Sequence, residues 1–256
     1  MENAMLVALS RQVALARELD VVANNVANLN TIGFKGDGAV FEEYVGDTAR
    51  SDNLPGTDGQ VSFVQDRATW VDMGQGPLQR TGNALDVAIE GKGFLVVQTP
   101  NGERYTRNGA LHINASGELV TGEGYQVLGD SGPITFQPKD RKIAISQDGT
   151  VSVREGDNTK TESERGKLRL VTFANAGALQ KDGASTFMAS DNATPQEDTT
   201  SRISQGTLEK SNVRGVVEMT RMIDVTRSYE QVAAMLAQQS DLQQTAIDKL
   251  AEVPTA

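Results

Sequence analysis

The residues that could carry acid–base or metal chemistry are few in this chain. Its one histidine, His112, lies in a short strand pattern, and no second histidine or cysteine stands at the spacing of a metal site. Asp86 and Glu90 share one face of a predicted strand, but at about 3.3 Å per residue they lie ~13 Å apart, beyond the span of a glycosidase carboxylate pair. We therefore predict that His112 has no ligand role and that Asp86 binds the turn near Gly82 and Asn83.

Two glycine pairs, in residues 91–93 (GKG) and 122–124 (GEG), invite comparison with phosphate-binding loops. Neither has the third glycine or the following helix that such a loop needs, because the helix N-terminus supplies the donors for the phosphate. The strand–turn–helix motif GxSxG of serine hydrolases is also missing. The sequence thus predicts no catalytic residue, no cofactor, no metal and no small-molecule ligand, and a protein that is not an enzyme.

The composition of the chain further restricts the classes of partner that it can bind. The net charge of the 256-residue chain is −10 and no cluster of lysine and arginine interrupts it, so nucleic acid and anionic membrane surfaces are poor partners. No apolar run reaches the length of a membrane span, and we expect no membrane insertion. The chain has no cysteine, and residues 1–9 lack the features of a cleavable signal peptide. Its length suits two modest domains, or one domain with an extended stalk.

Two long predicted helices at the ends of the chain are the elements that position its functional residues. From Met1 to about Lys35, apolar side chains recur at alternating spacings of three and four, which predicts one continuous apolar face. At about 1.5 Å per residue this helix is roughly 40 Å long, too long for one small core to cover. The run of Asn residues at 24–30 and then Gly33 predict its end, with Phe34 as an anchor and Lys35 as a cation near the helix terminus.

A similar pattern fills residues 213–250, with Asn212 as a plausible N-cap. Two such helices are expected to pair with each other and with copies of themselves. Polar residues interrupt both patterns, so an isolated two-helix coil would be marginal. An ordinary antiparallel helix pair packed on a globular domain is the alternative interpretation.

The middle of the chain has the character of β-structure. Short apolar runs separated by glycine turns at 77–189 predict an antiparallel all-β domain, with strands at 85–89, 94–98, 111–113, 134–136, 143–145, 151–153 and 168–173. Residues 36–76 and 190–210 are polar and rich in turn signals, and we expect them to form an extended β arm and its return path. A flexible linker is equally compatible with 47–59. The predicted fold class is α+β, with a discontinuous coiled-coil domain formed by 1–35 and 211–256.

Several segments resemble one family. ANNVANLNTIGFK at 23–35 is similar to the N-terminal motif of the flagellar rod and hook family, the axial proteins of the bacterial flagellum. Residues 81–111, 117–134 and 211–250 resemble further family segments. One departure is Leu95, where many relatives carry phenylalanine, and we interpret it as a tolerated core change.

The resemblance implies a mechanical function. The opening MENAMLVALSRQ is similar to the proximal-rod members of the family, which implies a structural subunit of the hollow drive shaft that transmits motor torque toward the distal rod and hook. It further implies a periplasmic location in the basal body, export through the flagellar export apparatus without a cleaved signal, and contacts with copies of itself and with neighbouring proximal- and distal-rod proteins. A distal-rod or short hook-type subunit of the same family is the alternative. A secreted β-domain protein that binds peptidoglycan is the alternative from another class.

The apolar residues of the two terminal segments are the candidate assembly interface. The predicted set consists of Leu6, Leu9, Val13, Leu15, Leu19, Val22, Val26, Leu29, Phe34, Met219, Met222, Tyr229, Leu236, Ile247 and Leu250.

Overall fold

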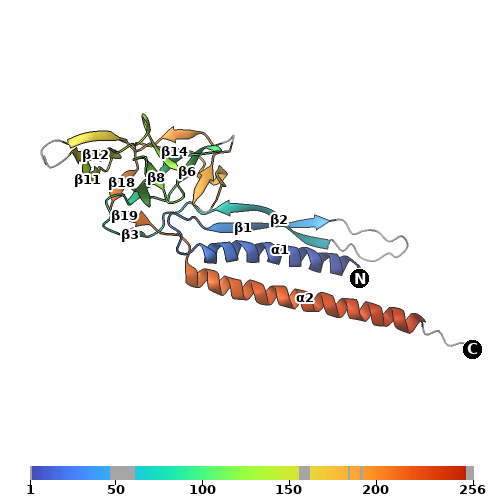
Figure 1. The fold of residues 1–256 in the computed structure, drawn as a ribbon. Helices are drawn as coiled ribbons and strands as arrows, with labels where there is room; N and C mark the ends of the chain where they lie inside the picture. Colours follow the sequence, from blue (N-terminus) through green and yellow to red (C-terminus); the bar gives the residue numbers. More distant parts are fainter. Residues whose placement is uncertain (1, 47–60, 156–161, 184, 191–192, 252–256) are drawn as a thin grey trace, which may run out of the picture. The chain divides into compact units, whose positions relative to one another are not determined.

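The chain divides into two compact units in a computed structural model that describes residues 2–46, 61–155, 162–183, 185–190 and 193–251 (Figure 1). The helical unit comprises Met1–Val26, Asp37–Trp70 and Gly215–Ala256, and the β unit comprises Ala27–Gly36 and Val71–Arg214. Both ends of the chain thus belong to one unit, and an antiparallel β region lies between them in sequence. The α+β class predicted from the sequence is confirmed.

The helical unit contains two long helices and two strands. These elements are α1 (Glu2–Ala27), α2 (Gly215–Ala251), β1 (Asp37–Gly46) and β2 (Val61–Val71). The two strands pair with each other, so part of the predicted arm is a two-stranded sheet, while residues 47–60 of that arm lie outside the described part of the chain. Neither helix is long and apolar enough to cross a membrane, as judged over the described residues.

The two helices lie side by side and antiparallel (Figure 1). Arg221 Nη2 lies 2.8 Å from Glu18 Oε1, and Asn25 Nδ2 donates to Glu218 Oε2 at 3.3 Å. The residue number falls along α2 as it rises along α1, which fixes the antiparallel direction. The buried apolar positions are Ala8, Ala14 and Val22 on α1 and Val225 and Val232 on α2. The predicted pairing of the terminal helices with each other is therefore confirmed.

A ten-stranded sheet organises the β unit. Its main path runs β15-β16-β6-β5-β9-β8-β7, with β10 beside β9, β14 beside β5, and β17 beside β14. The strands are β5 (Phe94–Thr99), β6 (Gly102–Thr106), β7 (Leu111–Ile113), β8 (Leu119–Thr121), β9 (Gln126–Gly129), β10 (Gly132–Pro133), β14 (Leu170–Phe173), β15 (Gln180–Lys181), β16 (Thr186–Met188) and β17 (Pro195–Glu197).

Three smaller sheets complete this unit. They are formed by β11 (Asp140–Ile145) with β12 (Thr150–Glu155) and β13 (Glu162–Lys167), by β18 (Arg202–Gln205) with β4 (Val87–Glu90), and by β19 (Thr207–Glu209) with β3 (Leu78–Arg80). A 3-10 turn, η1 (Ala176–Ala178), follows β14.

Strand β5 separates two apolar cores. Because successive side chains of a strand point to opposite faces, Leu95 and Val97 join one buried cluster while Phe94 and Val96 join the other. In the second cluster the ring of Phe94 packs edge-on against Phe173 and Phe187, each at 5.8 Å between centroids. Leu95 is fully buried, in agreement with its interpretation as a core residue.

The structure differs from the predicted elements in several places, and it contains strands that were not predicted, such as β6, β8, β9 and β13. Residues 190–210, expected as an extended return path, contain β17, β18 and β19. Ile203 of β18 is buried in the same apolar core as Leu95 and Val97. The predicted strand at 134–136 is an isolated bridge at Thr135. Helix α1 ends at Ala27, so Leu29 lies beyond it in the β unit and not on the helix face. Beyond Ala27 the backbone hydrogen bonds leave the helical pattern, because the amide of Thr31 donates to the carbonyl oxygen of Asn28 at 3.2 Å and that of Gly33 donates to the carbonyl oxygen of Glu209 at 2.8 Å.

Candidate functional site

The side chains first considered for chemistry have structural roles. Asp86 accepts hydrogen bonds from Thr81 Oγ1 at 2.6 Å and from Asn83 Nδ2 at 3.0 Å, and its amide donates to the carbonyl oxygen of Asn83 at 3.2 Å. It therefore braces the predicted turn through both side-chain and backbone groups. His112 is exposed on β7, opposite Val120 of β8, and Glu90 is exposed at the end of β4. Over the described part of the chain, no group of three or more His, Cys, Asp or Glu residues could hold a metal ion.

The glycine pair of residues 91–93 is a packing feature. A Cβ atom on Gly91 would collide with Ser201 Oγ, and one on Gly93 would lie 2.5 Å from Asp198 Oδ2. The amide of Gly93 instead donates to Ser201 Oγ at 3.0 Å. The two glycines allow the loop that carries Ser201 to lie directly on the backbone.

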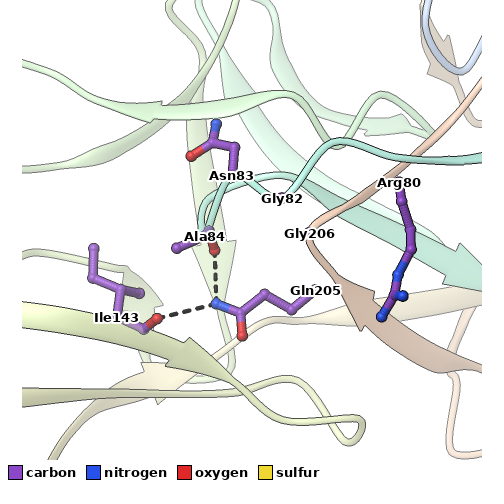
Figure 2. Close-up of a pocket in the computed structure, with 7 residues that line it drawn as sticks. All are labelled: Arg80, Gly82, Asn83, Ala84, Ile143, Gln205 and Gly206. Atoms are coloured by element: carbon purple, nitrogen blue, oxygen red, sulfur yellow. Dashed lines mark hydrogen bonds between the residues drawn. The ribbon is translucent and has the colours of Figure 1, made fainter.

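A groove of about 500 Å³ opens on the β unit beside the turn that Asp86 braces. Figure 2 shows its lining residues, which are Arg80, Gly82, Asn83, Ala84, Ile143, Gln205 and Gly206. The amide of Gln205 donates to the carbonyl oxygens of Ala84 at 2.8 Å and Ile143 at 3.1 Å, so it holds the wall of the groove together. The lining contains one charged side chain, Arg80, and no acid–base or nucleophile–base pair.

An apolar face of α1 is left uncovered by the chain itself. Leu6, Leu9 and Val13 are 52%, 49% and 57% exposed. At about 100° per residue they lie roughly on the opposite side of the helix from Glu18, whose carboxylate contacts Arg221 of α2. The predicted set thus contains two different faces of one helix. Half-buried members are Leu15, Leu19 and Val26.

Helix α2 shows the same division. Met219 and Ile247 of the predicted set are exposed, whereas Met222, Tyr229 and Leu236 are half-buried. The side chain of Leu250 lies outside the described residues. Val216 and Ile223, absent from the predicted set, are exposed at spacings of three and four from Met219 and complete a patch in the first turns of the helix. The sequence contains a signal for them, since Val216, Met219 and Ile223 follow the helical repeat, but the predicted set follows the neighbouring row through Met222 and Tyr229.

Phe34 is buried within the β unit, so its ring offers no surface to another subunit. It is 1% exposed, and Lys181 Nζ lies 4.0 Å from the ring centroid. Its carbonyl oxygen accepts a hydrogen bond from the amide of Asn212 at 3.3 Å. The aromatic residue is an anchor, as expected, but it anchors the chain to its own β unit.

Next to Phe34 lies a cluster of buried charges that sequence reasoning missed. Lys35 Nζ lies 2.5 Å from Glu209 Oε1, and both side chains are fully buried. Arg107 Nη1 lies 3.4 Å from the other carboxylate oxygen of Glu209. The predicted position of Lys35 at the helix terminus is thus replaced by a contact with Glu209 and with the carbonyl oxygen of Gly74 at 2.8 Å.

Burial dominates the electrostatics of this cluster. Removal from water lowers the pKa of Lys35 and that of Arg107, because desolvation penalises a charged group, and the carboxylate of Glu209 opposes both shifts. Arg107 also donates from Nη2 to the carbonyl oxygen of Gly91 at 2.7 Å and lies 4.8 Å from the centroid of the Phe94 ring. The carboxylate of Glu209 is therefore the shared ion-pair partner of two buried cations, Lys35 and Arg107.

Asn212 has a larger role than the predicted helix cap. Helix α2 begins at Gly215, three residues later. The side-chain oxygen of Asn212 accepts from the amide of Gly36 at 2.8 Å, and its amide donates to the carbonyl oxygens of Asp72 at 2.8 Å and Gly74 at 3.1 Å. We call the three segments 33–36, 72–76 and 209–212, which these bonds join within the β unit, the neck.

Three known protein families match parts of this chain. Residues 5–35 match the family described as flagella basal body rod protein, residues 88–153 match the flagellar hook protein FlgE/F/G D1 domain, and residues 204–249 match the C-terminal part of the flagellar basal body rod FlgEFG proteins. The chain is 39% identical over 256 residues to the flagellar basal-body rod protein FlgF of Caulobacter vibrioides, which covers 99% of this chain and all of that protein. The chain belongs to the flagellar basal-body rod protein family.

Two further relatives show how far the similarity extends within this rod family. FlgF of Mesorhizobium japonicum is 36% identical over 98% of both chains, and FlgG of Bacillus subtilis is 32% identical over 90% of this chain and 92% of its own length. The protein is accordingly a structural subunit of the rod in the flagellar basal body.

The three matched rod-family ranges meet at the buried charges. Lys35 is the last residue of the first range, Arg107 lies in the second and Glu209 in the third. Segments far apart in a rod protein's sequence are thus joined at one point of its β unit.

Proposed function

We propose that this chain is a proximal-rod subunit that assembles with copies of itself and with neighbouring rod proteins through the exposed faces of α1 and α2. The observation that carries the proposal is the row Leu6, Leu9 and Val13, which the chain leaves about half exposed although its own second helix already covers the opposite side. Exposed apolar rows of this kind are stabilised when another protein surface removes them from water.

The two exposed patches predict the type of assembly. One patch lies in the N-terminal half of α1, and the other, with Val216, Met219 and Ile223, lies in the first turns of α2. Different surfaces that bind one another make a heterologous contact, and such contacts generate an open helical array when the rotation does not close. In this proposal the helices of segments 1–35 and 211–256 form the wall of a hollow tube, the arm bridges adjacent subunits, and the β domain forms an outer layer.

Features of the sequence favour the proximal rod over the distal rod or a short hook-type protein. The opening MENAMLVALSRQ and the run SNVRGVVEMTRMIDVTRSYEQ are similar to the proximal-rod members, and no large inserted domain interrupts the chain. Relatives named FlgF align over 98–99% of this chain, whereas those named FlgG align over 83–90%.

The proposal includes a purely mechanical role at a periplasmic location. We infer that the subunit transmits torque, catalyses no reaction, and passes through the flagellar export apparatus without a cleaved signal. The net charge of −10 supports the inference that neither nucleic acid nor a membrane is a partner. The helical unit, with its uncovered faces, is expected to complete its order only on assembly.

The test is a charge placed in the α1 face. Leu9→Asp puts a carboxylate where the proposal requires an apolar contact, so cells carrying it should not swim. Leu9→Met keeps the apolar surface and serves as the matched control that should swim normally. Because Leu9 is 49% exposed in the single chain, circular dichroism and the melting temperature of the purified variant should match those of the parent. Normal swimming with Leu9→Asp would count decisively against the proposed interface.

A further inference from the structure

The groove beside the turn at Asp86 is already formed in the single chain. The amides of Thr81 and Gly82 donate to the carbonyl oxygen of Gly206 at 2.8 and 3.1 Å, and the amide of Gly206 donates to the carbonyl oxygen of Asp86 at 2.7 Å. A Cβ atom added to Gly82 would meet no atom of the described residues within 4 Å, its chain neighbours apart, so the groove is open at this point. Because these bonds fix the groove without an occupant, binding requires little ordering of the protein.

Arg80 supplies the positive charge of the groove lining. It ends strand β3, whose ladder with β19 runs from Glu209 in the neck to Arg80 at the groove, so its backbone is held in place. The side chain is exposed, and no carboxylate of the described residues lies within ion-pair distance of its guanidinium. Arg169 of the same unit, by contrast, lies 3.1 Å from Glu103. The guanidinium of Arg80 is thus available to an anion from outside the chain.

The segment 139–142 (KDRK) adds positive charge beside the groove. Figure 2 shows Arg80 and Ile143 on opposite sides of the lining, and the segment directly precedes Ile143 in the chain. Its three cations are exposed, whereas its carboxylate, Asp140, already lies 2.5 Å from Arg165. Positive charge therefore stands at both ends of the lining, and the one acidic group of the segment is neutralised within the chain.

The backbone of β11 bulges where this segment meets the groove. Lys142 has a φ of +44°, a left-handed conformation that is uncommon for a residue with a side chain, and the pairing with β12 shifts between Arg141 and Ala144. Such a bulge changes the direction of the side chains along a strand. The amide of Gln205 donates to the carbonyl oxygen of Ile143 at 3.1 Å, so the bulge is fastened to the groove wall. The surrounding bonds hold this unusual conformation at the edge of the groove.

The charge of the chain is divided unevenly between the two units. The helical unit contains seven lysine and arginine residues against sixteen aspartate and glutamate residues, a net charge of −9, whereas the β unit contains seventeen against eighteen, a net charge of −1. Within the helical unit the excess is densest in residues 37–70, with seven acidic and two basic residues. The cations around the groove and this acidic part of the arm are complementary in charge.

We propose that the groove binds a carboxylate from the acidic part of the arm, residues 37–70, of a second copy of this chain, with Arg80 as the contacting cation. A groove on one part of a chain that binds a different part of the next copy makes a heterologous contact, the type that extends a helical array. This inference rests on the proposed function for the presence of neighbouring copies. It adds a contact of the β unit to the contacts of the helix faces.

The experiment is site-specific photo-crosslinking in cells that build the rod. Ala84 lines the groove and is exposed, so it is replaced by p-benzoylphenylalanine, which on irradiation bonds covalently to a C–H group beside it. The expected product has twice the mass of the subunit, and mass spectrometry should locate its second attachment point in residues 37–70. Arg80→Glu should lower the yield of this product about tenfold, because like charges then face each other. Arg80→Lys keeps the charge and should retain most of the product.

Lys92→Glu is the matched control. Lys92 is an exposed lysine of the same unit outside the groove lining, so its reversal should leave the yield unchanged. The melting temperature of purified Arg80→Glu should equal that of the parent, because the side chain is exposed.

Four results overturn the inference. They are the absence of a doubled product in swimming cells, an adduct confined to one chain, an adduct to a different protein or outside residues 37–70, and a yield that Arg80→Glu leaves unchanged. Each of them leaves the helix-face interface standing when the cells swim. The Leu9→Asp experiment tests that interface alone, so the two proposals fail separately.

Discussion

The two units of this chain differ in how far their apolar side chains are buried. In the β unit, Leu95 and Val97 are fully buried between neighbouring strands. In the helical unit, Leu9 and Val13 leave about half of their surface in water, on a helix that is equally regular. Burial of apolar surface is the main favourable term in folding. The β unit therefore contains its own stabilising core, while the helical unit leaves part of its apolar surface in contact with water.

The largest expected effect is on the core of the β unit. Leu95→Ala removes buried methyl groups and leaves a cavity, and it should lower the free energy of unfolding by about 2–5 kcal/mol. The same change at Leu9, on the exposed helix face, should alter it by less than about 0.5 kcal/mol. Chemical denaturation of both purified variants measures the difference. Equal losses from the two substitutions would contradict the division between a complete and an incomplete unit.

Limited proteolysis tests the same comparison along the whole chain. In dilute purified protein, cleavage should begin in α1 and α2 and leave a resistant fragment that contains residues 71–214, because local opening requires least energy where few apolar groups are buried. Mass spectrometry of the fragments locates the cuts. If the terminal helices survive as long as the β unit, the helical unit is already complete in the single chain.

A smaller effect on stability is expected when the pH is lowered, through the carboxylate of Asp148 in one turn of the β unit. Hydrogen bonds from Ser146 and Thr150 lower the pKa of Asp148 from 3.8 to about 2. The depressed pKa means that this carboxylate stabilises the fold fully above pH 4, and that its contribution is lost as the pH falls toward 2. Asp148→Asn should make the melting temperature of the β unit less sensitive to pH in that window.

The control for the acid experiment is Asn101→Ala, a change at an exposed, uncharged residue in another turn of the same unit. The asparagine side chain does not titrate, so the pH dependence should stay as it is in the parent. If Asp148→Asn and the parent lose stability in parallel between pH 4 and 2, the turn does not contribute in the way described.

Local patterns in the sequence were sufficient to predict much of the fold. The spacing of three and four predicts α1 and α2, because side chains at these intervals share one helix face. Glycine and asparagine turns between short apolar runs predict the antiparallel β region, and the brace at Asp86 follows from its position in such a turn. Strands with few apolar residues, such as β13 and β19, escaped prediction because their pairing partners and not their own composition make them strands.

By itself, the sequence determined the class of the protein, its two long helices and the family to which it belongs, since each depends on residues close together along the chain. Only the tertiary structure decided which helix face is covered, that Phe34 is internal, and that Lys35 meets Glu209. The last two residues are 174 positions apart and share no periodic pattern. A buried ion pair depends on where folding brings two distant segments, and neither segment alone contains that information.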